Sequence, residues 1–287
     1  MKFVGCGHLI FSLPYTRKAK PPFEYEIMTL LKKSLLFLLL ALSSGFTPEK
    51  STFEEIQKGF PRVKDVYERK EELINMKMRS LEIPEETFGN MLIRVFKMEC
   101  ILEVWVQKPD GKYIKFKEFN IYALSGVLGP KRQEGDKQVP EGYYYIKDFN
   151  PQSNYYLSLG INYPNESDMK LSTAERKGRD IYIHGAKCSA GCLAMSNYYI
   201  EDIYMCAVKA HSNGQQQIPV EIFPFKMTDK NMMYYNHWGA YQRQVMFWNN
   251  LRKGYAFFEK YHRVPDVSVA DNGEYLFSDP ARVQASK

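Results

Sequence analysis

One histidine and two cysteines lie close together in the segment IYIHGAKCSAGCLAMSN, residues 181–197. A cysteine becomes a strong nucleophile when its thiol loses a proton, and a nearby histidine can accept that proton. His184 ends an apolar run that indicates a strand, and Cys192 precedes a segment with helical spacing. Because a strand end holds an imidazole in a fixed place, the arrangement predicts acyl transfer with Cys192 as nucleophile and His184 as its base.

The residues between these two side chains suit the same chemistry. Gly185 allows the chain to leave the strand sharply, and Gly191 permits the backbone to approach a substrate closely. We expect the amide N–H groups of Ala190, Gly191 and Cys192 to face a developing oxyanion, because backbone donors stabilise that charge.

Two structural interpretations of the same cysteines remain open. A zinc site made by His184, Cys188 and Cys192 would have the uncommon spacing H-x3-C-x3-C, and its fourth ligand would have to be Cys206 or His211. Alternatively, Cys188 forms a disulfide with Cys192 or with Cys206.

A segment near the N-terminus is typical of an export signal. Residues 28–45, MTLLKKSLLFLLLALSSG, combine two lysines, a short apolar run and a small-residue exit. We expect Met28 to be the true start, residues 1–27 to be an over-extended N-terminus, and the protein to be periplasmic or otherwise exported. Any membrane contact would then be limited to the signal segment, and an uncleaved anchor is the alternative.

Composition bounds the class of protein. The chain has 287 residues, of which 45% are apolar, enough for one large domain or a domain with an appended piece. The net charge of +6 is not clustered, so it does not point to nucleic acid. An aromatic content of 15%, with 21 tyrosines, suits a β-rich core and a surface that contacts sugars or peptides.

The patterning predicts a mainly β fold with flanking helices, a β-sandwich or barrel-like sheet. Residues 50–85 have helical spacing and form a helical lead-in, whereas residues 90–226 contain the strands and residues 227–287 form a C-terminal helical extension. The clearest strands after residue 130 are GYYYIKDF (142–149), YYLSLGIN (155–162), RDIYIHG (179–185) and IPVEIFPF (218–225).

The histidine and cysteine motif resembles the signature of a known family. IHG followed by SAGC is similar to the active-site pattern of the L,D-transpeptidase catalytic domain of YkuD type, in which His-Gly is followed, after a gap, by Ser/Thr-His-Gly-Cys. The resemblance is closer to the YafK-like branch, which shortens the gap, and it covers roughly residues 90–226. It implies that Cys192 is the nucleophile and His184 its base, with Ser189 and Gly191 as the other matched positions. Ala190 stands where most of the wider family has a second histidine.

A second segment, GPKRQEGDKQVPEGYY at 129–144, has the glycines and proline of a shaped loop. One interpretation is a structured turn. The other is a wall of the substrate groove, where Lys131 or Arg132 meets a carboxylate of a peptidoglycan stem peptide and Tyr163 lines the same groove.

The resemblance implies an exported cysteine enzyme that attacks stem peptides at meso-diaminopimelate through a thioester. Transfer to an amine gives transpeptidation, and transfer to water gives a hydrolase or amidase that releases protein or peptide, including lipoprotein, linked to peptidoglycan. A non-catalytic peptidoglycan-binding module is the second alternative. This chemistry needs no metal or organic cofactor, and we expect no nucleic-acid partner.

Overall fold

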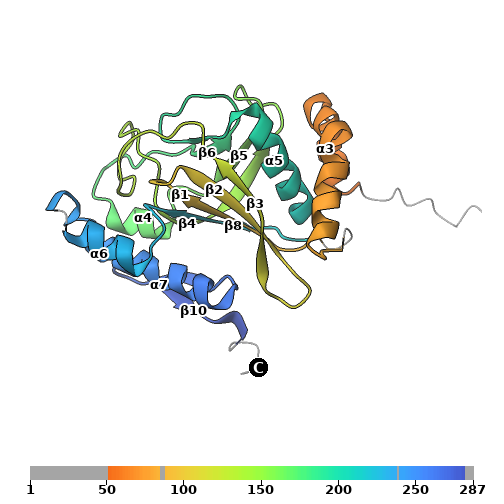
Figure 1. Cartoon of the computed structure of the whole chain (residues 1–287). Coiled ribbons are helices and arrows are strands. Elements are labelled where there is room, and N and C mark those ends of the chain that lie inside the picture. Colours follow the sequence, from red (N-terminus) through yellow and green to blue (C-terminus); the bar gives the residue numbers. More distant parts are fainter. Residues whose placement is uncertain (1–50, 85–87, 238, 282–287) are drawn as a thin grey trace, which may run out of the picture. The chain divides into compact units, whose positions relative to one another are not determined.

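The segments with period-two patterning fold into one mixed β-sheet (Figure 1). The structure, a computed structural model, describes residues 51–84, 88–237 and 239–281. The predicted over-extended N-terminus and signal segment, residues 1–45, lie outside the described residues. The ten strands are β1 (Met91–Phe96), β2 (Ile101–Gln107), β3 (Tyr113–Asn120), β4 (Gly142–Asn150), β5 (Ser158–Ile161), β6 (Tyr182–His184), β7 (Leu193–Ala194), β8 (Ile218–Phe223), β9 (Asp266–Val269) and β10 (Tyr275–Ser278).

Eight strands form the main sheet in the order β3-β2-β1-β8-β4-β5-β6-β7, and β9 and β10 pair separately. β1 is parallel to β8 and β6 is parallel to β7, whereas the other neighbours are antiparallel. The predicted mainly β fold with flanking helices is confirmed. The main layer is a single mixed sheet. Helices cover both of its faces, in the positions that a second sheet would occupy in a sandwich.

The helices cover the two faces of the sheet (Figure 1). They are α2 (Phe53–Lys58), α3 (Pro61–Ser80), α4 (Glu166–Leu171), α5 (Ser196–Ser212), α6 (Asp229–His237), the short 3-10 helix η2 (Gly239–Tyr241) and α7 (Val245–Tyr261). Helix α5 packs on one face with α3 outside it, and α6 and α7 lie on the other. Within the described part of the chain, no helix is long and apolar enough to cross a membrane.

Alternation along the strands separates the apolar core from the other face. Ile161, Ile183 and Leu193 point to the side of α5, where they belong to the largest buried apolar cluster. The residues beside them on these strands therefore point to the opposite face. This alternation decides the face of the sheet on which the histidine of the motif projects.

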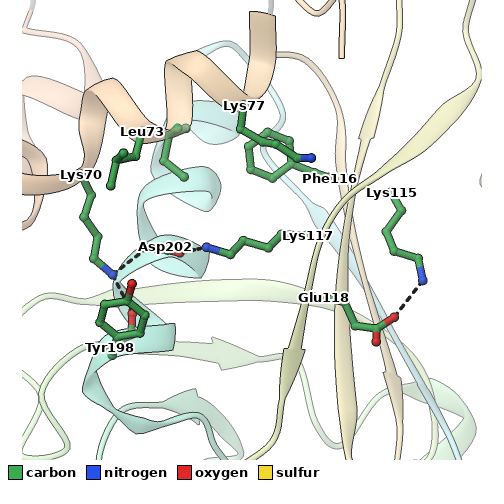
Figure 2. A pocket seen from close by; sticks show the side chains of 10 residues that line it. Lys70, Leu73, Lys77, Lys115, Phe116, Lys117, Glu118, Tyr198 and Asp202 are labelled. Atoms are coloured by element: carbon green, nitrogen blue, oxygen red, sulfur yellow. Dashed lines mark hydrogen bonds and ion pairs between the residues drawn. The ribbon is translucent and has the colours of Figure 1, made fainter. Parts of the chain in front are cut away.

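A buried lysine holds helix α3 against helix α5 (Figure 2). Lys70 on α3 donates to Asp202 at 2.7 Å and to the carbonyl of Tyr198 at 2.8 Å, both on α5. Lys117 of β3 also pairs with Asp202. Figure 2 shows these contacts in a hollow between α3, β3 and α5, where Lys115 pairs with Glu118. Three of the four lysines that line this hollow, Lys70, Lys115 and Lys117, therefore pair with carboxylates of the protein itself.

The C-terminal helix is tied to the sheet through one buried carboxylate. Glu141 is fully buried and accepts hydrogen bonds from Lys97 Nζ at 2.8 Å, Gly129 N at 2.7 Å and Trp248 Nε1 at 2.8 Å. Lys97 also donates to the carbonyls of Gly129 and Val139. The network thus joins helix α7 to both ends of the loop 129–139.

Candidate active site

The parallel pairing of β6 and β7 brings together the two segments that carry His184 and Cys192. Ile183 is opposite Leu193, and His184 is opposite Ala194. Because side chains alternate along a strand, His184 projects on the same side as Ala194, away from the α5 core. Cys192 directly precedes β7, two residues before the position opposite His184.

The imidazole of His184 is held in one tautomer. Its Nδ1 lies 2.5 Å from the carbonyl oxygen of Gly185, and a carbonyl can only accept, so Nδ1 carries the proton. Nε2 is then the basic nitrogen, as a proton acceptor for a thiol requires. The ring of Tyr155 lies 4.7 Å from the imidazole, between ring centroids. Burial lowers the pKa of His184, although the Gly185 carbonyl opposes this shift.

The sulfur of Cys192 contacts the backbone at the start of β6. Tyr182 N donates to Sγ at 3.4 Å, and the thiol donates to the carbonyl of Asp180 at 3.8 Å. Burial raises the pKa of the Cys192 thiol, while the Tyr182 N–H and the nearby Lys131 ammonium lower it to a smaller extent. A lowered His184 pKa and a raised Cys192 pKa both favour neutral side chains over a thiolate–imidazolium pair.

This charge state predicts slow alkylation of Cys192 at neutral pH. At pH 7 we expect iodoacetamide to modify Cys192 several-fold more slowly than the exposed Cys188. The Cys192 rate should keep rising above about pH 8.5, the ordinary thiol value, because its thiolate forms later. Peptide mass spectrometry over a pH series measures both rates in one sample. A Cys192 rate that exceeds that of Cys188 at pH 7 would show a preformed thiolate.

Two serines fix the loop that precedes Cys192. Ser189 Oγ donates to the Cys192 carbonyl at 2.6 Å, and Gly191 N donates to Ser125 Oγ at 2.6 Å. Ser125 Oγ in turn donates to the carbonyl of Lys137 at 2.7 Å. Of the three amides expected to face an oxyanion, that of Gly191 thus already has an acceptor in the protein.

The two glycines of the motif are required for reasons that differ from the expected ones. A Cβ on Gly185 would lie 2.6 Å from the carbonyl oxygen of Tyr155, so this position needs space, and the left-handed turn falls on Ala186 at φ 60°. Gly191 has φ +110°, and a Cβ there would lie 3.2 Å from the carbonyl oxygen of Gln138. A neighbouring loop, not a substrate, makes this close approach.

Two of the residues expected to bind substrate are instead buried within the protein. Lys131 is 4% exposed, and its ammonium pairs with Asp136 and donates to the Gln133 carbonyl. Tyr163 is 2% exposed and donates its hydroxyl to the Lys177 carbonyl at 2.9 Å. Neither side chain leaves a free group for a ligand, so the expected direct contacts are corrected to structural ones. Lys131 still acts on the thiol through its charge.

Arg132 turns to the other side of its loop. Its guanidinium pairs with the buried Asp168 at 3.0 Å and lies 5.0 Å from the ring of Phe247 on α7. Burial raises the pKa of Asp168 to about 6, although Arg132 lowers it. Arg132 remains partly exposed and, unlike Lys131, is available to a ligand.

The cysteines do not adopt the alternative roles considered for them in the described residues. Cys100, Cys188, Cys192 and Cys206 are all free thiols, so the expected disulfide alternatives do not form. Cys206 is buried in α5, on the core side of the sheet, whereas Cys188 is exposed. Among the described residues, no group of three or more His, Cys, Asp or Glu side chains could hold a metal ion.

Comparison with known proteins assigns the family. The sequence model of the L,D-transpeptidase catalytic domain, YkuD, matches residues 103–222. YafK of Escherichia coli strain K12 is 36% identical over 204 residues, which cover 70% of this chain and 79% of YafK, and YafK of strain O157:H7 gives the same values. This chain belongs to the L,D-transpeptidase (YkuD) family.

Solved structures also match part of this chain. The helical cell shape determining protein Pgp2 of Campylobacter jejuni is 19% identical, with 63% of this chain and 73% of Pgp2 covered at a TM-score of 0.40. L,D-transpeptidase 1 of Mycobacterium tuberculosis is 14% identical, with 47% and 62% covered at a TM-score of 0.27.

The L,D-transpeptidase domain contains functional neighbours that the sequence did not reveal. Ser125 and Tyr155 lie far from the motif in sequence, yet one fixes the Gly191 amide and the other covers the imidazole of His184. No local pattern marks either residue, because each contact depends on how distant loops meet. Both Ser125 and the motif fall within the matched residues 103–222, whereas α6, α7 and the β9–β10 pair follow them.

Proposed function

We propose that this protein is a peptidoglycan-modifying cysteine enzyme that transfers an acyl group through a Cys192 thioester. The observation that carries the proposal is the β6–β7 pairing, which sets Cys192 two residues before the position opposite His184, with His184 Nδ1 protonated and Nε2 left basic. Membership of the L,D-transpeptidase family supports a stem peptide with meso-diaminopimelate as substrate. Export through residues 28–45, to the periplasm or beyond, is part of the proposal.

The first half-reaction follows from these two side chains. His184 Nε2 takes the proton of the Cys192 thiol as sulfur attacks the peptide carbonyl carbon, giving a tetrahedral oxyanion. The amides of Ala190 and Cys192 are the proposed oxyanion donors, because the Gly191 amide is engaged with Ser125. The carbon–nitrogen bond then breaks, His184 returns the proton to the leaving amine, and a thioester remains on Cys192.

The acceptor decides the outcome of the second half-reaction. His184 takes a proton from an attacking amine or from water as the new bond forms at the carbonyl carbon. The carbon–sulfur bond then breaks, and His184 returns the proton to the departing Cys192 sulfur. An amine acceptor gives transpeptidation. Water gives hydrolysis, the second candidate, and because Cys192 is partly exposed either acceptor can reach the thioester from solvent. A hydrolase of this kind would release peptide or lipoprotein attached to peptidoglycan.

Mass spectrometry of sacculi treated with wild-type protein and with Cys192→Ala tests the proposal. New 3→3 cross-links that appear only with wild-type protein indicate transpeptidation. Released protein or peptide that appears only with wild-type protein indicates hydrolysis. Identical digests from the two proteins would contradict both, and binding of either protein to sacculi would then support a non-catalytic peptidoglycan-binding module.

A further inference from the structure

A hollow of about 550 Å³ lies on the Arg132 side of the loop that contains Lys131 and Arg132. It is bounded by this loop, the end of α4, the start of α7 and the β9–β10 turn. Its lining residues are Pro130, Arg132, Leu171, Arg243, Gln244, Met246, Phe247, Asn250, Asn272 and Glu274. Most of them come from beyond residue 222, so the C-terminal extension completes this hollow on the matched domain.

The charge of the hollow favours an anion. Arg132 and Arg243 line it, and Glu274 is its one acidic lining residue. Arg132 is held in place by Asp168 and the Phe247 ring. Within residues 51–84, 88–237 and 239–281, the exposed Arg243 has no ion pair and no hydrogen-bond partner for its guanidinium. The Arg132 guanidinium is thus held in place and partly neutralised by Asp168, while the Arg243 guanidinium is free to pair with a ligand.

The walls suit a peptide. Met246 is 79% exposed, and with Leu171 and Phe247 it gives the hollow an apolar side next to the two arginines. Gln244 adds a polar amide side chain to the lining beside this apolar side. A peptide C-terminus combines a carboxylate, a small side chain and an N–H within one residue.

We infer that this hollow binds the C-terminal carboxylate of a peptide, with Arg243 and Arg132 as its guanidinium partners. Planar guanidinium groups match carboxylates in geometry as well as in charge. The identification of that peptide with a stem peptide rests on the proposed function. Lys131 and Arg132 are consecutive: the charge of the first acts on the Cys192 thiol, and the second lines the hollow.

Isothermal titration calorimetry with the Cys192→Ala protein tests the inference without turnover. The probes are a stem tetrapeptide containing meso-diaminopimelate with a free C-terminal carboxylate and the same peptide with a C-terminal amide. We expect the amide to bind about tenfold more weakly, as loss of a charge-assisted hydrogen bond implies. Adding Arg243→Gln should weaken binding of the acid about tenfold and leave binding of the amide unchanged.

Lys253→Gln is the matched control, because it removes one positive charge at an exposed position outside the hollow, on helix α7, which begins two residues after Arg243. It should leave the affinities of both peptides unchanged. Equal affinities for acid and amide, no binding of either, or equal losses of both peptides in Arg243→Gln would overturn the inference. If wild-type protein processes sacculi but acid and amide bind equally, the proposed function stands and the hollow has another role. If wild-type protein leaves sacculi unchanged while the acid still binds more tightly through Arg243, the hollow binds a peptide carboxylate and the proposed function is wrong.

Discussion

Replacing Cys192 by serine is expected to reduce turnover of stem peptides by about 10⁴-fold or more. The hydroxyl is a far weaker nucleophile than the thiol, and a thioester cannot form. Substrate affinity should change little, because the substitution removes one sulfur atom and leaves the loop bonds of Ser189 and Gly191 in place. Liquid chromatography with mass spectrometry of the peptide products measures the rate, and the thioester is sought as a mass increase on Cys192.

Cys188→Ser is the control for this experiment. Cys188 is exposed and lies in the same loop, so its substitution tests whether any thiol in the segment is sufficient. We expect a rate within about twofold of wild type, as for exposed substitutions away from the reacting groups. The assignment of the nucleophile would be wrong if Cys188→Ser abolished turnover and Cys192→Ser did not.

The largest loss of stability is expected from Glu141→Ala. This change leaves the ammonium of Lys97 buried without its carboxylate and removes the acceptor of Trp248 and Gly129. Breaking a buried ion pair on one side costs about 3–5 kcal/mol of unfolding free energy. Urea unfolding followed by tryptophan fluorescence measures the difference in the midpoint.

Two comparisons make this prediction specific. Glu118→Ala removes a carboxylate that pairs with Lys115 on the surface, and it should cost less than about 1 kcal/mol. The double variant Lys97→Met with Glu141→Leu should recover part of the loss, because it leaves no unpaired buried charge. A loss in Glu141→Ala no larger than in Glu118→Ala would show that the network does not hold α7 and the loop 129–139 together.

The strands could be predicted from alternation, and the pairing between them could not. The strand predicted at 142–149 is observed as β4, Gly142–Asn150, and that at 218–225 as β8, Ile218–Phe223. By contrast, β7 has two residues and lies inside the motif, where too few positions exist to show a period. Its parallel pairing with β6 sets Ala194 opposite His184 and so brings the segment that carries Cys192 to β6.

The residue types of the candidate site were also easier to predict than their environments. The sequence shows that Lys131 and Arg132 are basic neighbours in a shaped loop, but not that one turns inward to Asp136 and the other outward to Phe247. Burial depends on the distant segments that close over a side chain. A positive charge in a loop therefore indicates a ligand contact only when its own protein partners are known.

The place of β8 in the sheet has a consequence for the order in which the chain assembles. β8 is the last of the eight strands in sequence, yet it lies between β1 and β4 and joins the group β3-β2-β1 to the group β4-β5-β6-β7. The pairs β1–β2, β2–β3, β4–β5 and β5–β6 are antiparallel and join strands close in sequence, but the two groups meet only after residue 223 is available. Pairing across such a sequence separation is slow. The thiol at residue 192 therefore precedes, along the chain, the strand that completes the sheet.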